Sequence, residues 1–141
     1  MPAPADLNSF FDIYRSAVLA KDVDAMMSIY GPDFTAFDMW GAWSLVGEAP
    51  WLEMNKDWLG SLGSESVIVE FDDITIIPGT DVAAAHATLT FKAVSDKGET
   101  LRSMQNRLTW VAKRTDGIWK IIHQHTSVPI EPAGMKPRLH R

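Results

Sequence analysis

The stretch that decides the fold is 101-LRSMQNRLTWVAKRTDGIWKIIHQHTSVP-129. It divides at Thr115-Asp116-Gly117 into two alternating segments, residues 101–114 and 118–128. An Asp-Gly pair between two such segments is typical of a tight hairpin turn. We therefore predict two long antiparallel strands. Strands of this length must twist and coil, so their sheet should be strongly curved and have a concave face.

The alternation of apolar and polar residues extends upstream of this hairpin to Ser66. Two turn sequences, Pro78-Gly79-Thr80-Asp81 and Ser95-Asp96-Lys97-Gly98, divide the region into two further strands. In the second strand every other residue from Ala83 to Phe91 is apolar, which predicts one buried face. In the first strand the phase slips at Asp72-Asp73, which indicates a β-bulge.

Upstream of Ser66 the apolar residues recur at helical spacing instead. A first helix is predicted over residues 7–18, with Asp6 as a possible N-cap. A second helix begins after Asp22, and its apolar face extends to Tyr30 before Gly31-Pro32 ends it. The N-terminal part of the chain is therefore expected to be mainly helical.

A third helix is predicted from about residue 48 to Gly60, with Pro50 in its first turn. Residues 34–38 and 43–46 are interpreted as two short strands that pair with each other. Helices followed by hairpin-linked strands indicate an α+β fold, with three helices packed on one face of a curved antiparallel sheet. We expect a single domain over residues 1–141, with a folded core of about 6–129 and a basic, proline-broken tail over 130–141.

The composition excludes several classes of site. Hydrophobic residues make up 46% of the 141 residues and charged residues 22%, as in globular domains. There is no cysteine, which excludes disulfides, thiolate metal sites and a cysteine nucleophile. The net charge is −5 and the basic residues are scattered, so no nucleic-acid partner is expected. Without a signal-peptide pattern or an apolar run of about 20 residues, we expect a cytoplasmic protein with no membrane partner.

Three segments resemble one known superfamily: 17-AVLAKDVDAMMSIYGPDFTAFD-38, 45-LVGEAPW-51 and 107-RLTWVAKRTDGIWKIIHQHTSVP-129. They are similar to the nuclear-transport-factor-2-like superfamily, and within it to the SnoaL-like group that includes the association domain of calcium/calmodulin-dependent kinase II. The resemblance implies a cone-shaped α+β barrel with a small-molecule pocket at its wide end. It also implies a homodimer formed through the outer face of the sheet.

The resemblance to ketosteroid isomerase, a member of this superfamily, gives two catalytic candidates. Asp38 matches that enzyme's catalytic carboxylate and Tyr14 matches its oxyanion-donating tyrosine. A carboxylate beside an apolar helix can move a proton, and a phenol can hydrogen-bond the developing enolate oxygen. The alternatives are that Tyr14 continues the core stripe of its helix and that Asp38 caps the turn before Gly41.

The second acid of that enzyme's oxyanion hole has no counterpart in this sequence. The matching strand offers Arg107 and Thr109, with Asn106 on the opposite face. Arg107, directed into the pocket, would favour an anionic or phenolic substrate, because a guanidinium group pairs with oxyanions. As a catalytic residue it would stabilise the developing negative charge together with Tyr14. It could equally neutralise Asp38 as a buried pair.

The last strand carries His123 and His125 on one face, together with Trp119 and Ile121. Two histidines at this spacing can chelate a metal, but no third ligand is evident, so no metal is expected. The resemblance implies that this is the outer face and that Ile122, Gln124 and Thr126 line the pocket. The alternative is that His125 faces inward as a general acid or base.

The remaining candidates are residues that would form the walls of the pocket. The expected substrate-binding residues are Trp40, Trp51, Trp58, Leu89, Phe91, Thr109, Gln124 and Thr126. Aromatic walls suit a flat or aromatic ligand, although they also suit an ordinary core. The sequence therefore indicates a cofactor-independent isomerase, dehydratase or other lyase that acts on an apolar substrate. The alternative is a non-catalytic ligand-binding or oligomerisation module.

Overall fold

The computed structural model describes residues 7–141, so the expected N-cap Asp6 lies outside the described residues. The helices are α1 (Leu7–Ala20), α2 (Val23–Met27) and α3 (Glu48–Gly60). The strands are β1 (Tyr30–Phe37), β2 (Leu45–Val46), β3 (Ser66–Ile77), β4 (Val82–Val94), β5 (Thr100–Thr115), β6 (Ile118–Ser127), β7 (Ile130–Glu131) and β8 (Lys136–Pro137).

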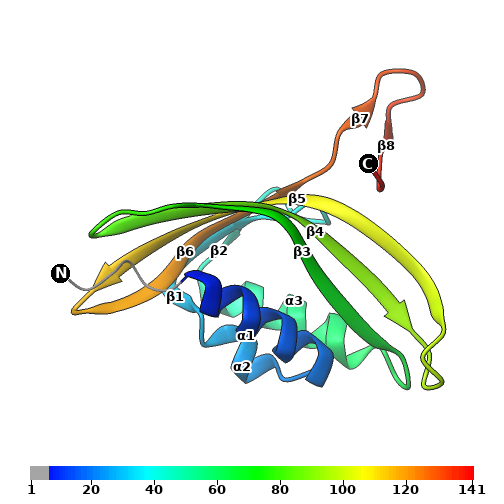
Figure 1. Ribbon diagram of the computed structural model, residues 1–141, viewed down its shortest axis with the longest axis horizontal. Coiled ribbons are helices and arrows are strands. Elements are labelled where there is room, and N and C mark those ends of the chain that lie inside the picture. The colour runs from blue at the N-terminus through cyan, green and yellow to red at the C-terminus, as the bar shows by residue number, and fades with distance from the viewer. Residues whose placement is uncertain (1–6) are drawn as a thin grey trace.

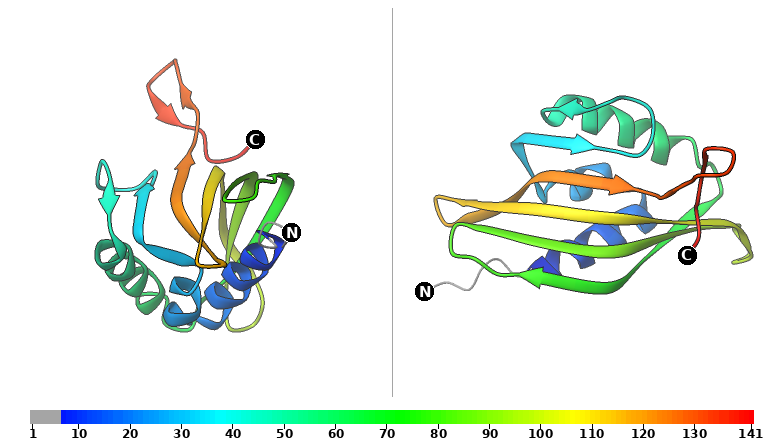
Figure 2. Two further views of the ribbon diagram at one scale, coloured as in Figure 1. Left: turned by 90° about the vertical axis from the view of Figure 1, so that its left-hand side faces the viewer. Right: turned by 90° about the horizontal axis from the view of Figure 1, so that it is seen from above.

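The main sheet has the strand order β2-β1-β6-β5-β4-β3. Its neighbours are antiparallel except for β1 and β6, which run parallel. All three helices lie on one face of the curved sheet (Figures 1 and 2). The expected α+β fold, with helices on a strongly curved sheet, is therefore confirmed. The sheet curves like part of a cone and stays open between its edge strands β2 and β3.

Apolar spacing explains how α1 packs against the sheet. Its buried residues are Leu7, Phe10, Phe11, Tyr14, Ala17 and Val18, which form one stripe along the helix. The ring of Phe11 lies 4.6 Å from that of Trp110 on β5 and 4.7 Å from that of Phe71 on β3, measured between centroids. These aromatic contacts join the first helix to two strands far away in the sequence.

Asp22 caps α2 as predicted, because its carboxylate accepts a hydrogen bond from the backbone N–H of Ala25 over 3.0 Å. The prediction that this helix extends to Tyr30 is wrong. The helix ends at Met27, and Tyr30 begins β1, where it pairs with Ile121 of β6. Pairing with the distant β6 therefore decides the conformation of Tyr30, against the helical spacing of its own segment.

Two bulges set which residues face the core. The predicted bulge at Asp72-Asp73 is present as a register shift between Asp72 and Thr75, with Asp73 at a φ of 54°. A second bulge lies on β6, where Ile121 and His123, two positions apart, pair with two consecutive residues of β5.

The second bulge corrects the assignment of faces on β6. The extra residue, Ile122, reverses the alternation of the strand. Trp119 and Ile121 are buried on the core side, whereas His125 is exposed on the outer side. The prediction that Trp119 and Ile121 share a face with the histidines is therefore wrong.

The C-terminal segment 130–141 has a structure that its proline-rich composition does not indicate. The β7–β8 hairpin projects away from the sheet on the side opposite the helices (Figure 1). The chain then returns to the sheet, where the backbone N–H of Gln105 donates to the carbonyl of Leu139 over 2.7 Å. This contact lies on a part of β5 beyond Arg107, the last β5 residue that pairs with β6. Within residues 7–141 the helices are all too short or too polar to cross a membrane.

Candidate functional site

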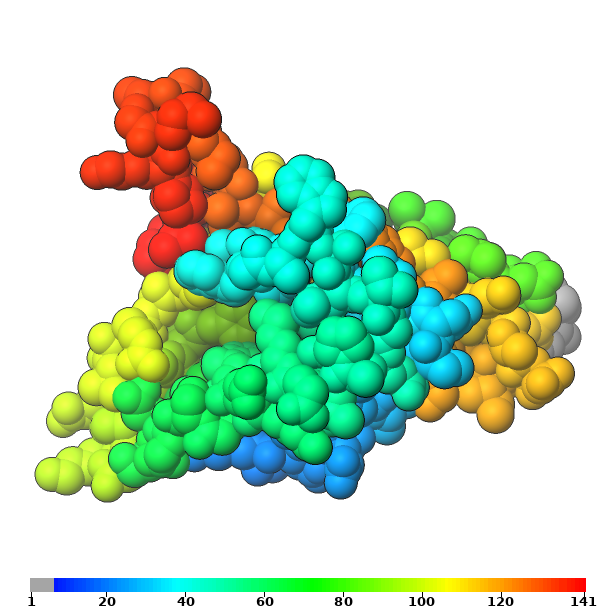
Figure 3. All heavy atoms as spheres, turned by 180° about the vertical axis from the view of Figure 1, so that it is seen from behind, coloured from blue at the N-terminus to red at the C-terminus, as the bar shows by residue number. Residues whose placement is uncertain are grey.

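A cavity of about 560 Å³ lies between the concave face of the sheet and the helices. Its opening is the recess in Figure 3 between the loop after β1, α3 and the β4–β5 hairpin. Eight of the twelve expected site residues line it: Tyr14, Asp38, Trp40, Trp51, Trp58, Leu89, Phe91 and Gln124. Helix α1, the end of β1, α3 and strands β4 and β6 thus contribute to one cavity.

Asp38 is the acidic residue among those that line the cavity. It follows the last residue of β1 and is half-buried. Its Oδ1 accepts a hydrogen bond from the hydroxyl of Thr126 over 3.1 Å, and its Oδ2 accepts one from the backbone N–H of Trp40 over 3.2 Å. Burial raises the pKa of Asp38, and these two hydrogen bonds oppose the rise. The result is a more basic carboxylate that two donors hold in place.

Tyr14 lines the same cavity from α1 and is buried, with 4% of its surface exposed. Burial, together with the nearby charge of Asp38, raises the pKa of the Tyr14 phenol. The phenol therefore stays protonated and can donate a hydrogen bond. Among residues 7–141 its hydroxyl has no hydrogen-bond partner, so this donor is available to a ligand.

Gln124 presents a second donor to the cavity. Its Oε1 accepts two buried hydrogen bonds, from the hydroxyl of Tyr30 over 2.7 Å and from Nε1 of Trp110 over 2.8 Å. Because both donors need an oxygen, they determine the orientation of the amide. Its Nε2 has no partner within the described part of the chain and is left for a bound molecule.

Asn106 is a polar residue of the cavity that we did not predict. The sequence predicts Asn106 on the face opposite Arg107, with Arg107 toward the pocket. In the structure Asn106 is buried and lines the cavity, with its Nδ2 3.5 Å from the sulfur of Met39. Its Oδ1 has no partner among residues 7–141. The sequence does contain a signal for it: Asn106 alternates in step with the apolar residues Leu108 and Trp110 and so shares their face of β5.

The predictions that Arg107 and Thr109 point into the pocket are wrong. Both are exposed on the outer face of β5, because the strand turns Asn106, Leu108 and Trp110 toward the core. The Nε of Arg107 donates to the hydroxyl oxygen of Ser127 over 3.2 Å on that outer face. The guanidinium group of Arg107 therefore neither neutralises Asp38 nor reaches a ligand in this cavity.

His125 also lies on the outer face, where its ring packs edge-on against Phe37 at 5.6 Å between centroids. The alternative that His125 faces the pocket is therefore wrong. Thr126 is buried on the inner side but does not line the cavity. Its hydroxyl supports Asp38 and accepts a hydrogen bond from the backbone N–H of Met39 over 3.1 Å. Thr126 therefore acts on the site through the carboxylate.

The tryptophans differ in how much they belong to the core. Trp51 is 3% exposed, and its ring lies 5.8 Å from Tyr30 and 5.4 Å from Phe34. Trp58 is less buried and packs edge-on against Phe91 at 5.6 Å. Trp40 is 54% exposed at the opening. Trp51 is thus both wall and core, whereas Trp58 and Trp40 contribute mainly to the wall and the entrance.

The polar groups of the cavity define its possible chemistry. They comprise one basic carboxylate, one protonated phenol, the amides of Asn55, Asn106 and Gln124, and the side chains of Arg102 and Ser103, set in a mostly apolar and aromatic cavity. No cluster of three or more histidine, cysteine, aspartate or glutamate residues suited to a metal occurs within residues 7–141. The arrangement can bind a flat apolar molecule and place a base beside a carbon or oxygen atom of it.

Comparison with known proteins places this chain among related domains. The sequence model of the SnoaL-like domain matches residues 7–131. An NTF2-like protein of unknown function from Pseudomonas putida KT2440 has a TM-score of 0.83 at 21% identity, over 96% of this chain and 93% of that chain. An NTF2-like protein with a cystatin-like fold from Novosphingobium aromaticivorans has a TM-score of 0.74 at 14% identity, over 92% and 84% of the two chains.

A third structure, from Xanthomonas campestris, is named as a candidate calcium/calmodulin-dependent protein kinase II association domain. It has a TM-score of 0.70 at 20% identity and covers 89% of this chain and 87% of its own. No curated protein matches the chain. At these identities the structural likeness shows the fold and leaves the chemistry to the residues of the cavity.

Proposed function

The chain belongs to the SnoaL-like domain family, and from that premise we propose that it is a cofactor-independent enzyme acting on a small apolar molecule. The family and its NTF2-like fold include both small-molecule enzymes and binding proteins. One observation carries the proposal. The half-buried carboxylate of Asp38 lies in the same apolar cavity as the neutral phenol of Tyr14, and burial raises the pKa of that carboxylate.

Asp38 would act as the proton-transfer group. Its carboxylate would take a proton from a carbon next to a carbonyl group, and the electrons of the broken C–H bond would move to the carbonyl oxygen. A carboxylate with a raised pKa is a stronger base and stays ionised at neutral pH as long as that pKa lies below 7. Returning the proton to another carbon would complete an isomerisation, and loss of a leaving group would complete an elimination.

The developing negative charge would be stabilised by donors that belong to the cavity. The Tyr14 hydroxyl and the Gln124 Nε2 are both unpartnered within the described residues and both line the cavity. Neutral donors aimed at a developing oxyanion in an enclosed apolar site stabilise it more than they would in water. These residues replace Arg107, which the fold turns outward.

The substrate class follows from the walls. Trp51, Trp58 and Phe91 surround the cavity with aromatic surface, and Trp40 stands at its opening. A volume of about 560 Å³ accommodates a molecule of one to a few rings. We therefore propose a cyclic or aromatic carbonyl compound as the substrate.

Hydrogen exchange at carbon tests this proposal without knowledge of the physiological substrate. The chain is incubated in D₂O with a panel of cyclic and aryl ketones, and NMR follows the loss of the signal next to the carbonyl. Quenching of tryptophan fluorescence identifies the compounds that bind. We expect faster exchange for at least one bound ketone, and a loss of about 100-fold or more in Asp38→Asn. Asp57→Asn, which removes an exposed carboxylate of α3, is the matched control and should keep the rate.

Two results would contradict the enzyme assignment. One is binding of ketones without any acceleration of exchange. The other is full exchange by a folded Asp38→Asn variant. Either would favour the alternative, a non-catalytic ligand-binding module.

The homodimer implied by the family resemblance is also a proposal. Phe37 is 42% exposed on the outer face of the sheet and packs against the rings of His123 and His125. This exposed aromatic cluster supports pairing of two outer faces. Light scattering coupled to size-exclusion chromatography measures the mass, and a concentration-independent monomer would exclude the dimer.

A further inference from the structure

A second cavity, of about 230 Å³, lies between the outer face of the sheet and the returning C-terminal segment. Its walls include three arginines from distant parts of the chain, Arg107 on β5 and Arg138 and Arg141 after the β7–β8 hairpin. The chain as a whole carries a net charge of −5. A small cavity walled by three arginines is therefore a local reversal of the protein's charge. It shares the wall residue Asn106 with the cavity of Asp38, and its other wall residues differ.

Two of the three arginines lack an acidic partner. Arg141 pairs with Asp73, with 2.6 Å between guanidinium nitrogen and carboxylate oxygen. Arg107 and Arg138 form no ion pair with the described residues. Each donates one hydrogen bond, from its Nε: Arg107 to the hydroxyl of Ser127, and Arg138 to a backbone carbonyl over 2.9 Å. The terminal nitrogens of both guanidinium groups have no partner among residues 7–141, which leaves them for a ligand.

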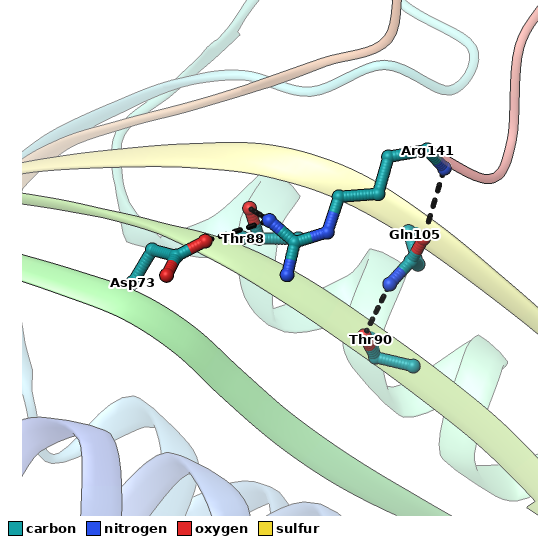
Figure 4. Close-up of polar contacts among 5 residues, drawn as sticks. All are labelled: Asp73, Thr88, Thr90, Gln105 and Arg141. Atoms are coloured by element: carbon teal, nitrogen blue, oxygen red, sulfur yellow. Dashed lines mark hydrogen bonds and ion pairs between the residues drawn. The ribbon is translucent and has the colours of Figure 1, made fainter.

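Hydroxyl groups add further donors to the same cavity. Ser127 accepts from Arg107, and Thr88 accepts from Arg141 over 3.4 Å, so the hydrogen of each hydroxyl remains to be donated. Figure 4 shows how the C-terminal residue is held there: Arg141 reaches Asp73 and Thr88, and its backbone N–H donates to Gln105. The wall of the cavity that this segment forms is thus anchored to strands β3, β4 and β5.

We propose that this second cavity binds a phosphate group. The two unpaired guanidinium groups supply two positive charges, which match the charge of about −2 on a phosphate monoester or inorganic phosphate at neutral pH. Arg107, Arg138, Ser127 and Thr88 line the cavity from four separate parts of the chain, and donors spread in this way suit a tetrahedral oxyanion. A planar carboxylate would be satisfied by a single guanidinium fork and would leave the others unused.

The site is open to solvent, so the affinity should be modest and sensitive to salt. Isothermal titration of the full chain with inorganic phosphate, in a low-salt buffer free of other oxyanions, is the direct test. We expect one site per chain with a dissociation constant of about 1 mM or tighter. Added sodium chloride should weaken the binding, because it screens the exposed guanidinium groups.

Charge-matched variants separate a built site from general attraction. Arg107→Gln and Arg138→Gln should each weaken phosphate binding about tenfold, and the double variant should abolish it. Lys113→Gln removes the same charge from the same face of β5 but lies outside the cavity, so it should change the affinity less than about twofold. Thermal unfolding of each variant confirms that the chain is folded, as expected for exposed side chains.

Three outcomes would overturn the proposal. The first is the absence of saturable binding to inorganic phosphate up to about 10 mM. The second is an equal loss of affinity in Lys113→Gln and Arg107→Gln, which would show attraction to net charge alone. The third is tighter binding of succinate than of phosphate, which would assign the site to carboxylates.

Discussion

Thr126 on β6 donates its hydroxyl hydrogen to Oδ1 of Asp38, across 3.1 Å and 88 positions of sequence. The same hydroxyl oxygen accepts the backbone N–H of Met39, the residue after Asp38. Thr126 therefore ties the end of β1 to the neighbouring parallel strand and orients the carboxylate at the cavity wall. Burial raises the pKa of Asp38, and this hydrogen bond limits the rise.

The first prediction concerns Thr126→Val. Loss of the hydroxyl removes a donor to the ionised carboxylate, so the pKa of Asp38 should rise further above its ordinary value. The acidic limb of any activity that depends on ionised Asp38 should move to higher pH with it. Titration of the side-chain carboxyl carbon by NMR measures the change. Thr126→Ser, which keeps the hydroxyl, is the control, and an unchanged pKa in Thr126→Val would contradict the assigned role.

The second prediction concerns stability and pH. Because burial raises the pKa of Asp38, the folded chain binds this proton more tightly than the unfolded chain does. The resulting stabilisation is complete below the ordinary aspartate pKa and is lost as the pH rises through the raised, folded-state value.

Asp38→Asn should therefore be more stable than the parent chain at neutral pH, and this advantage should shrink in acid. Urea unfolding at neutral pH and at about pH 4 measures the difference. Asp57→Asn should show no comparable trend, since that carboxylate is exposed. The prediction would be contradicted if the stability difference between Asp38→Asn and the parent chain favoured the variant more in acid than at neutral pH.

The third prediction concerns the buried amide of Gln124. Gln124→Leu would leave the Tyr30 hydroxyl and the Trp110 Nε1 without their shared acceptor. Two unsatisfied buried donors should cost about 2–4 kcal/mol of unfolding free energy. Tyr30→Phe removes only one of the two bonds and leaves the amide paired with Trp110, so it should cost about 1 kcal/mol. Denaturant unfolding compares the variants, and equal losses would show that the shared acceptor is unimportant.

The fourth prediction distinguishes the roles of Trp51 and Trp58, which both line the cavity. Trp51→Ala should destabilise the fold by about 3–5 kcal/mol, because its ring is buried against Tyr30 and Phe34. Trp58→Ala should cost less than half as much, since the ring is only partly buried. It should nevertheless weaken ligand binding, as measured by quenching of the remaining tryptophan fluorescence. Unchanged affinity in a folded Trp58→Ala chain would remove Trp58 from the wall.

Much of the fold was predictable because its signals are local. The hairpin at Thr115-Asp116-Gly117, the bulge at Asp72-Asp73 and the cap at Asp22 follow from turn chemistry and from the period of apolar residues. The parallel pairing of β1 with β6 was not predictable in this way. It depends on residues about 90 positions apart and converts Tyr30 from an expected helical residue into the first residue of a strand.

The sequence by itself therefore determined the order of helices and strands up to the end of β6, the curvature of the sheet and the position of Asp38 at the end of the first strand. Only the tertiary structure decided which groups meet. On β6, the extra residue Ile122 reverses which residues face the core. On β5, Leu108 and Trp110 are buried in the core, and because Asn106 shares their face it points inward while Arg107 points outward. Alternation along a strand specifies which residues share a face, but packing against other elements selects the face that is buried.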